Sequence, residues 1–228
     1  MGLVLSKRRM IVTLRRQPSS LLLAAQLLAV LIYPFLDNSD AGRVAYVLFC
    51  NVVLALALWV VNRNPFVNWI GWVLAIPAVI CSVVGHLGKH PSFLTVGYSL
   101  EALLYFYTAV GLIFYMLGDQ SVTFDELVAA GATFTLLAWS FAFAFLVCQA
   151  WVPGSFTASQ NTQDPRSWLE LLFLSFATLS GVGLSDIIPI RSFARSLVML
   201  EMFCGVMYLA IVVSRLIALA TIRAKQGK

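Results

Sequence analysis

Charged residues are scarce in this sequence, and that scarcity sets the first limit on its fold class. They form 11% of the 228 residues, whereas apolar residues form 61%. An average soluble domain has about 25% charged and about 45–50% apolar residues. One small globular core cannot bury such an excess, so the composition indicates a protein that crosses the membrane several times. The apolar runs are continuous and roughly 20 residues long, which favours helices over barrel strands.

Residue sets that carry covalent chemistry or bind nucleic acid are also missing. No nucleophile, base and orienting group occur together, so we expect no enzymatic activity and no cofactor. The basic residues gather mainly near the two ends without aromatic neighbours, which argues against a nucleic-acid partner. The cysteines have no paired spacing and are predicted to be buried free thiols. They are Cys50, Cys81, Cys148 and Cys204.

Six apolar runs are long enough to span a lipid bilayer as helices. They are Ser19–Leu36, Ala41–Val61, Pro65–Leu87, Phe93–Leu117, Phe124–Val152 and Ser192–Ile222. Six crossings place both termini on one side of the membrane, and the basic residues near the ends place that side in the cytoplasm. The sequence therefore predicts an all-α, multi-pass protein of the cell membrane with both termini cytoplasmic.

A further apolar piece, Pro165–Leu179, is too short to span the membrane. Asp164 and Pro165 are predicted to begin its helix, as the cap and the first-turn proline. A glycine-containing stretch follows it. This order is typical of a re-entrant half-helix and loop, which is tolerated at membrane depth only where protein or a water-filled pore covers it.

The residues from Ser175 to Pro189 read S-F-A-T-L-S-G-V-G-L-S-D-I-I-P. A pore that conducts dehydrated cations needs a short helix followed by consecutive backbone carbonyls turned toward a central axis. Glycines permit such a backbone, and the negative end of the preceding helix dipole stabilises a cation. Because one chain supplies one strand of this lining, four chains are expected to assemble around the axis.

This segment resembles the T-L-T-T-V-G-Y-G-D-I-x-P signature of the potassium-channel pore-loop family. The matching residues are Thr178, Leu179, Val182, Gly183, Asp186, Ile187 and Pro189. The helix that follows is similar to the inner helix of bacterial members. The resemblance implies a homotetramer in a bacterial inner membrane, with six transmembrane helices, a re-entrant pore helix and a filter loop in each subunit. It implies a four-helix N-terminal unit (residues 1–118) and a pore domain (residues 119–228).

The same resemblance assigns the ion pathway to a filter of six residues. They are Ser180, Gly181, Val182, Gly183, Leu184 and Ser185. The carbonyls of residues 181–184 are expected to bind K+ or another monovalent cation. Three positions depart from the family pattern, because Gly181 replaces a threonine, Leu184 an aromatic residue and Ser185 a glycine. Selectivity depends on the number and geometry of the oxygens, so we expect weakened discrimination between K+ and Na+.

Four further residues are predicted to support the filter or the gate. Thr178 and Asp186 flank the filter, and Asp186 either attracts cations to the outer mouth or braces the short helix. Glu201 is an acid at membrane depth; we favour a hydrogen-bond acceptor behind the filter over a direct ion ligand. Gly205 is either a gating hinge of the inner helix or a site of close helix packing, and the sequence leaves both roles open.

The fourth predicted span, Phe93–Leu117, contains no lysine or arginine. A voltage sensor needs repeated basic residues, since each charge gains only about 2.3 kcal/mol per 100 mV. We therefore expect a passive cation channel that is not gated by a charged fourth helix. The sequence leaves three roles open for the first four helices: a scaffold, a lipid-facing collar or a partner site. The alternative is a non-conducting relative that acts as a membrane scaffold or sensor, whereas a secondary transporter would show inverted repeats, which we do not find.

Overall fold

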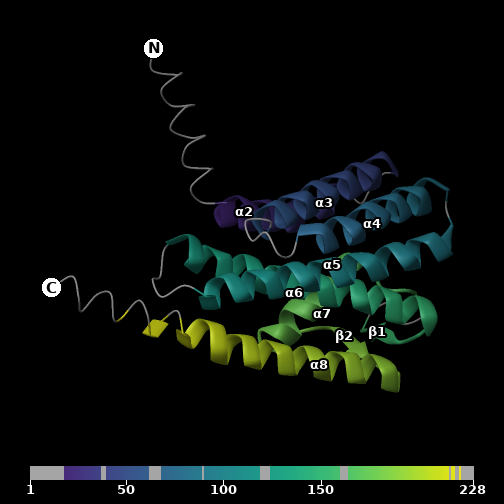
Figure 1. Cartoon of the computed structure of the whole chain (residues 1–228). Coiled ribbons are helices and arrows are strands. Elements are labelled where there is room, and N and C mark those ends of the chain that lie inside the picture. Colours follow the sequence, from purple (N-terminus) through teal and green to yellow (C-terminus); the bar gives the residue numbers. More distant parts are fainter. Residues whose placement is uncertain are drawn as a thin grey trace, which may run out of the picture.

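The structure is a computed structural model of the chain that describes residues 18–36, 40–61, 68–88, 90–118, 124–159, 164–215, 217–218 and 221. A helix covers most of every predicted span, because a continuous apolar run satisfies its backbone in lipid by folding as a helix. The elements, shown in Figure 1, are α2 (Pro18–Leu36), α3 (Asp40–Val61), α4 (Asn68–Gly88), α5 (Pro91–Gly118), α6 (Phe124–Trp151), β1 (Phe156–Ala158), α7 (Trp168–Leu179), β2 (Ile187–Pro189), α8 (Ser192–Tyr208) and the π-helix η1 (Leu209–Val213).

Four stretches of helix are long and apolar enough to cross a membrane. They are α2, α5, α6 and the continuous stretch formed by α8 and η1. The apolar segments within α3 and α4 are shorter, at Phe49–Trp59 and Ile70–Gly85. Within the described residues, length and composition therefore support four crossings, and the expected count of six remains a prediction.

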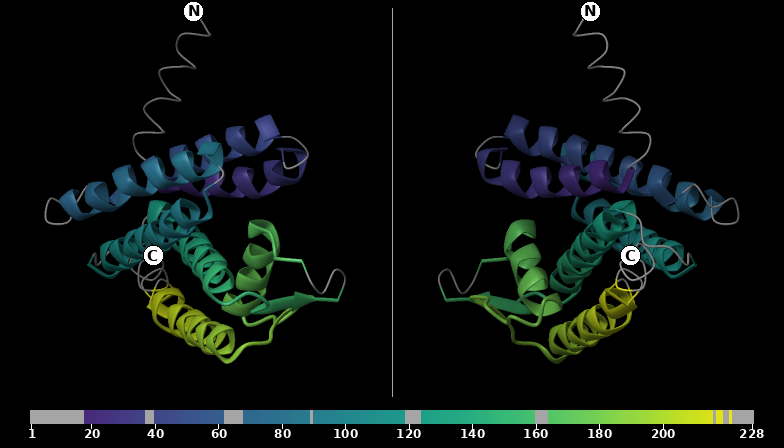
Figure 2. Two further views of the ribbon diagram at one scale, coloured as in Figure 1. Left: turned by 90° about the vertical axis from the view of Figure 1, so that its right-hand side faces the viewer. Right: turned by 90° about the vertical axis from the view of Figure 1, so that its left-hand side faces the viewer.

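The helices are arranged in layers around α6 (Figures 1 and 2). α2, α3 and α4 lie on one side of α5 and α6, and α7 and α8 lie on the other side. α6 packs against α2, α5, α7 and α8, and α5 also packs against α4. In α6, 78% of the spanning residues are buried, against 22–33% in the other three candidate spans. The fifth predicted span is therefore the core helix of the subunit.

Polar side chains join α6 to two neighbouring helices, α2 and α5. The backbone N–H and the hydroxyl of Ser19, at the start of α2, donate to the carboxylate of Asp125 at 3.2 and 3.0 Å. The Ser140 hydroxyl donates to the carbonyl of Ala102 in α5 at 2.8 Å. Hydrogen bonds of this kind hold helices together where lipid supplies no hydrophobic driving force.

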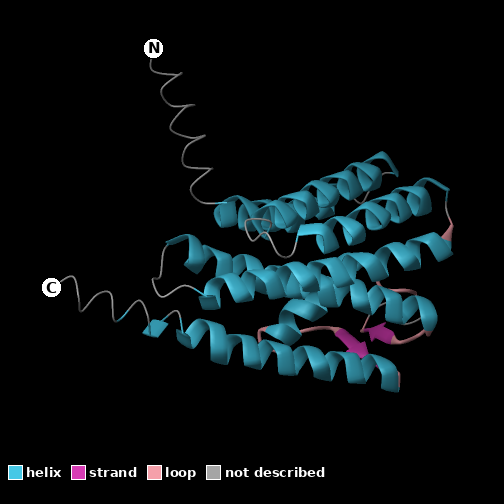
Figure 3. Ribbon diagram, viewed as in Figure 1, coloured by secondary structure: helices cyan, strands magenta, loops and turns pink. Residues whose placement is uncertain are grey.

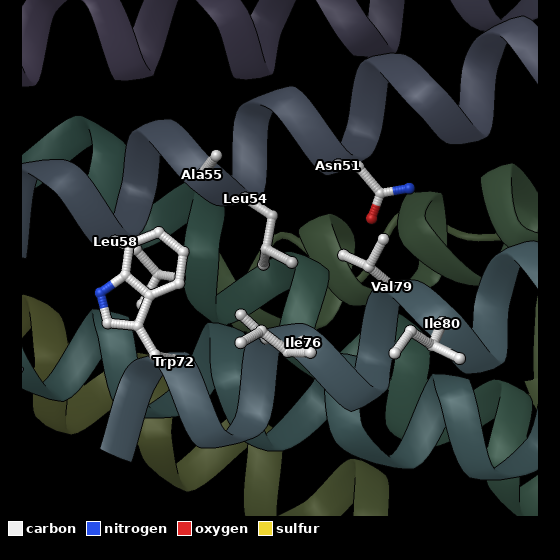
Figure 4. A pocket seen from close by; sticks show the side chains of 9 residues that line it. Asn51, Leu54, Ala55, Leu58, Trp72, Ile76, Val79 and Ile80 are labelled. Carbon is white, nitrogen blue, oxygen red and sulfur yellow. The ribbon is translucent and has the colours of Figure 1, made fainter. Parts of the chain in front are cut away.

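The contact between α3 and α4 is looser, and an apolar groove runs along it (Figure 4). Leu54 and Leu58 of α3 face Trp72 and Ile76 of α4 across this groove. Trp72 and Ile76 remain about half exposed, at 49% and 55%. The groove is thus a surface feature of the N-terminal helices, on the opposite side of α5 and α6 from α7 and α8.

A short antiparallel sheet, which the sequence does not predict, joins the ends of the segment that contains α7. β1 pairs with β2 in the register Phe156 to Pro189 and Ala158 to Ile187. Beyond the sheet, the N–H of Ile190 donates to the carbonyl of Ser155 at 2.8 Å. The residues just before α8 are therefore fixed to the residues just after α6.

Candidate functional site

The short helix α7 begins at Trp168, and the predicted start at Asp164 and Pro165 is wrong. Ser167 is the N-cap: its hydroxyl oxygen accepts from the N–H of Glu170 at 3.3 Å. In return, the N–H of Ser167 donates to Oε2 of Glu170 at 2.6 Å. This reciprocal capping box satisfies two amides at once, which sets the helix start more strongly than the upstream proline does.

The residue before the cap attaches α7 to the end of α6. The N–H of Arg166 donates to Oε1 of Gln149 at 2.7 Å, and Nε2 of Gln149 donates to the carbonyl of Arg166 at 3.0 Å. The Arg166 guanidinium pairs with Glu170 at 3.3 Å, and its Nε donates to the carbonyl of Asp164 at 3.0 Å. Arg166 is 4% exposed. The N-terminus of α7 is therefore held firmly against α6.

The C-terminus of α7 turns directly into the predicted filter. Ser180 is the C-cap, and its N–H donates to the carbonyl of Phe176 at 3.1 Å. The N–H of Gly181 donates to Thr178 O at 3.1 Å. Gly181 and Gly183 have positive φ angles of 73° and 69°. Residues with a Cβ rarely adopt a positive φ, so the turn favours glycine at both positions.

The filter residues run back in irregular conformation from the end of α7 to β2. Figure 3 shows this loop alongside α8, heading toward the end at which α8 begins. The end of α7 lies against Gly205, since a Cβ added there would be 2.2 Å from the carbonyl oxygen of Leu179. Gly205 is 13 residues beyond Ser192, which places this contact about 20 Å along α8. The segment therefore enters the helix layer and returns to the same end, as a re-entrant loop does.

Within one chain the filter is largely exposed. Val182 and Leu184 are 71% and 74% exposed, and both filter glycines are exposed. The two filter serines contact the backbone: Ser180 Oγ accepts from the N–H of Val182 at 3.4 Å, and Ser185 Oγ accepts from the N–H of Ile187 at 3.1 Å. The N–H of Gly183 donates to Ala177 O at 2.9 Å.

The carbonyls of the filter differ in whether they accept a hydrogen bond from a backbone amide. The N–H of Ser185 donates to the carbonyl of Gly183 at 3.1 Å, closing a tight turn over Leu184. Among the described residues, no backbone N–H donates to the carbonyls of Gly181, Val182 or Leu184. Three of the four carbonyls that the resemblance assigns to ion binding are thus not engaged by backbone amides, and the fourth is.

Of the predicted support residues, Glu201 has the most distinct surroundings. It is fully buried on α8, and its Oε1 is hydrogen-bonded to the hydroxyl of Ser175 in α7. The same hydroxyl also lies 2.8 Å from the carbonyl of Ala138 in α6. Oε2 of Glu201 has no hydrogen-bond partner among the described residues. Glu201 and Ser175 thus join α8, α7 and α6, and a role of Glu201 in supporting the filter remains a prediction.

The other support residues separate into buried and exposed positions. Thr178 is 6% exposed on α7, whereas Asp186 is exposed at the end of the filter. Gly205 lies at the close approach to Leu179 described above, which is the packing role that the sequence left open. The hinge role of Gly205 remains a prediction.

The structure adds two features to the site that the sequence does not predict. The first is the role of Ser175, for which the available signal is a serine within an apolar helix, since such a serine implies a buried polar partner. The π-helix η1 gives no sequence signal, and it follows directly after Tyr208, whose hydroxyl donates to Ala130 O at 2.6 Å. Such π segments in α-helices often occur at functional sites.

In the described parts of the chain, no three histidine, cysteine, aspartate or glutamate side chains gather to hold a metal ion. The oxygens that the filter offers are backbone carbonyls and the hydroxyls of Ser180 and Ser185. Such groups suit a weakly bound cation that exchanges quickly. The absence of a cofactor remains a prediction.

Comparison with known proteins gives one family. The sequence family described as ion channel matches residues 102–221, which are 120 of the 228 residues. The match begins within α5 and includes α6, α7, the filter, α8 and η1. No curated protein and no solved structure matches the chain. The chain is therefore a multi-pass membrane protein with a passive channel function, and it belongs to the ion channel family of the potassium-channel superfamily.

Proposed function

We propose that four copies of this chain form a passive cation channel whose filter is lined by residues 180–185. The observation that carries the proposal is the exposed, glycine-bent loop at the end of α7, which returns alongside α8. One copy of this loop cannot surround an ion. Four copies around an axis would supply a ring of carbonyls at each level, as a cation filter requires.

The exposed face of α8 supports assembly. This helix directly follows the filter and β2 in the sequence. Large apolar side chains on it remain more than half exposed in the single chain. They include Phe193, Met199, Leu200, Phe203 and Val206. A contiguous apolar face next to a polar loop is typical of a surface that contacts other subunits or lines a pathway. We propose that the neighbouring subunits cover part of this face and that the rest lines the inner cavity.

The filter geometry favours reduced K+ selectivity. The carbonyl of Gly183 accepts from Ser185, and Gly181 offers no side-chain hydroxyl at the innermost level. Leu184 is exposed and has no polar group that could brace the filter from behind. A filter with fewer fixed oxygens discriminates less between cations. We propose that K+ and Na+ both permeate.

We also propose six crossings with cytoplasmic termini and no gating by a charged fourth helix. In Figure 1 the beginning of α2 and the end of α8 lie at the same end of the helices. The chain ends nearest to them carry basic residues, which favour the cytoplasmic side. α5 contains no lysine or arginine, so a membrane voltage has little charge to act upon there.

The test is cation flux through purified protein in liposomes, measured in turn with K+, Na+ and Cs+ gradients. Gly183→Ala forces a Cβ onto a residue with φ of 69°, and we expect it to abolish flux. Gly154→Ala is the matched control, since Gly154 has φ of 71°, also has open space around it, and lies outside the filter.

Three outcomes count against the proposal. Absence of flux under any gradient from an intact tetramer would defeat conduction and favour the scaffold or sensor alternative. Bi-ionic reversal potentials with a strong K+ preference would defeat the reduced selectivity alone. A mass other than that of four chains, measured on the protein in a lipid disc, would defeat the tetramer.

A further inference from the structure

The first residue of the pore helix lies in a group of aromatic rings that come mostly from outside the pore. The Trp168 ring centroid is 5.6 Å from that of Tyr33 in α2 and 5.6 Å from that of Tyr46 in α3. It is 5.3 Å from the ring of Trp139 in α6, in an edge-to-face arrangement with an interplanar angle of 88°. Trp168 therefore contacts the N-terminal helices directly.

The rings continue from Trp168 into α5. Tyr105 stacks on Phe143 with centroids 5.6 Å apart and an interplanar angle of 4°, and it meets Trp139 edge-on at 5.5 Å. Tyr33 and Tyr46 meet edge-to-face at 4.9 Å. We call this group the aromatic cluster; it consists of Tyr33, Tyr46, Tyr98, Tyr105, Trp139, Phe143 and Trp168.

A half-buried carboxyl group extends the aromatic cluster to α4. Glu101 is three residues after Tyr98 and four before Tyr105, so the three share one face of α5. The Ser82 hydroxyl of α4 donates to Oε1 of Glu101 at 2.5 Å. The N-terminal helices α2 to α5 are therefore each connected to the aromatic cluster by a ring or by this hydrogen bond.

Edge-to-face and stacked aromatic pairs have preferred geometries, and packed interiors transmit displacements. α7 is a capped helix of 12 residues, about 18 Å long, with Trp168 at one end and Ser180 at the other. Figure 2 shows α7 beside α6, reaching from the layer of α2 and α3 toward α8. A shift of α2 or α3 against Trp168 would thus be carried along α7 to the first filter residue.

We infer that Trp168 is a positioning residue through which the N-terminal helices set the placement of the filter. This assigns a role to α2–α5, whose function the sequence left open, and it rests on the proposed channel function for its effect on ions. A tryptophan that only filled space would affect the stability of the subunit and leave the filter unchanged. A positioning tryptophan affects the filter through contacts made at the opposite end of α7.

The test compares substitutions in the aromatic cluster by two readouts. The first is hydrogen exchange of the Gly181 and Gly183 amides, which donate to Thr178 O and Ala177 O. Trp168→Leu and Tyr33→Leu each remove an aromatic contact, and we expect each to speed this exchange about two- to tenfold. Trp168→Phe retains a ring and should restore most of the protection.

The second readout is the ratio of K+ to Na+ flux in liposomes, which should change in the same variants and in the same order. Tyr33 is inferred to affect the filter only by way of Trp168, so the double variant Tyr33→Leu/Trp168→Leu should be no worse than Trp168→Leu alone. Trp72→Leu is the control, because Trp72 belongs to the N-terminal helices and lines the groove of Figure 4, away from α7.

The outcomes separate the two proposals. If the filter amides of Trp168→Leu and Tyr33→Leu exchange as in the unmodified protein while both variants lose thermal stability, Trp168 is only structural and the inference fails. If the unmodified protein conducts no ions, the channel proposal fails, and the exchange readout still decides the inference. Should Trp168→Leu not fold, Tyr33→Leu and Trp168→Phe give the same comparison.

Discussion

At Gly205 the inner helix touches the backbone of the pore helix. An added Cβ would lie 2.2 Å from the carbonyl oxygen of Leu179, a distance that real Cβ atoms essentially never show. The obstructing atom belongs to the backbone, so α7 or α8 must move. We expect Gly205→Ala to destabilise the subunit by about 1–3 kcal/mol, in the range for overpacking.

The measurement is the thermal midpoint of the purified protein in detergent, together with cation flux. Gly118→Ala is the control, because a Cβ added at Gly118 meets nothing within 4 Å. Equal behaviour of the two variants would contradict the close approach of α7 and α8. The sequence left packing and hinge as equal alternatives here, since a glycine in an apolar helix serves either purpose.

The hydrogen bonds of Ser175 lead to a second prediction at the residue scale. Its hydroxyl has one proton, yet it lies near two acceptors, Ala138 O and Oε1 of Glu201. A donor at position 201 would let the hydroxyl donate to Ala138 while accepting from that residue. Glu201→Gln supplies an amide N–H, so we expect it to fold with nearly the stability of the unmodified protein.

Ser175→Ala should behave differently, because it leaves both oxygens of Glu201 without a hydrogen-bond partner among the described residues. An unsatisfied buried polar group costs about 1–3 kcal/mol. Thermal midpoints of the two variants, measured side by side, provide the check. The prediction is wrong if Glu201→Gln lowers the midpoint as much as Ser175→Ala does.

Among the elements, α7 depends most clearly on a local signal. Ser167 and Glu170 form its capping box, and replacing such a cap by alanine costs about 1 kcal/mol. We expect Ser167→Ala to lower the thermal midpoint and to speed hydrogen exchange in the first turn of α7. Ser196→Ala, at an exposed serine within α8, should change neither. Faster exchange in the Ser196 variant alone would refute this assignment.

Elements with continuous apolar runs could be predicted closely from the sequence. The sequence predicts α2 at Ser19–Leu36, one residue from its actual start at Pro18, and it predicts the start of α6 at Phe124, where the helix begins. The sheet of β1 and β2 could not be predicted, because three-residue strands show no alternation and their pairing joins residues about 30 apart. η1 was missed for a similar reason, since a π segment depends on packing against neighbours.

In the candidate site, too, some features could be predicted from the sequence and others depend on contacts between distant residues. The resemblance assigns Gly181 and Gly183 to the filter, although Gly181 departs from the family pattern, and the positive φ angles of both residues favour glycine. The pairing of Ser175 with Glu201 and the rings around Trp168 could not be recognised. Both bring together residues from separate helices, and a single sequence does not show which residues of separate helices pair.

For the whole molecule, the number of crossings is the property most open to test. Four stretches of helix meet the length and hydropathy of a span, whereas the sequence predicts six crossings by adding α3 and α4. Arg63 and Lys89 precede and follow α4 in the sequence, and both lie outside the described residues. If α4 crosses the membrane, these two positions lie on opposite sides.

We therefore expect Lys89→Cys to react with a membrane-impermeant thiol reagent in intact cells and Arg63→Cys to be protected. The unmodified chain, whose four cysteines lie within helices, is the control. Labelling at both positions would show that α3 and α4 do not cross, and that both belong to the outer surface of the assembly.

The filter is held at both of its ends by elements outside it, α8 at one end and β1 at the other. At one end, Leu179 rests against Gly205; at the other, Ile187 is paired with Ala158. A segment with fixed end points and fixed contour length cannot slide along the pore axis. In the channel proposed above, a change in ion occupancy is then expected to be absorbed by rotation of individual peptide planes between Ser180 and Asp186, so that the filter would open and close by twisting in place.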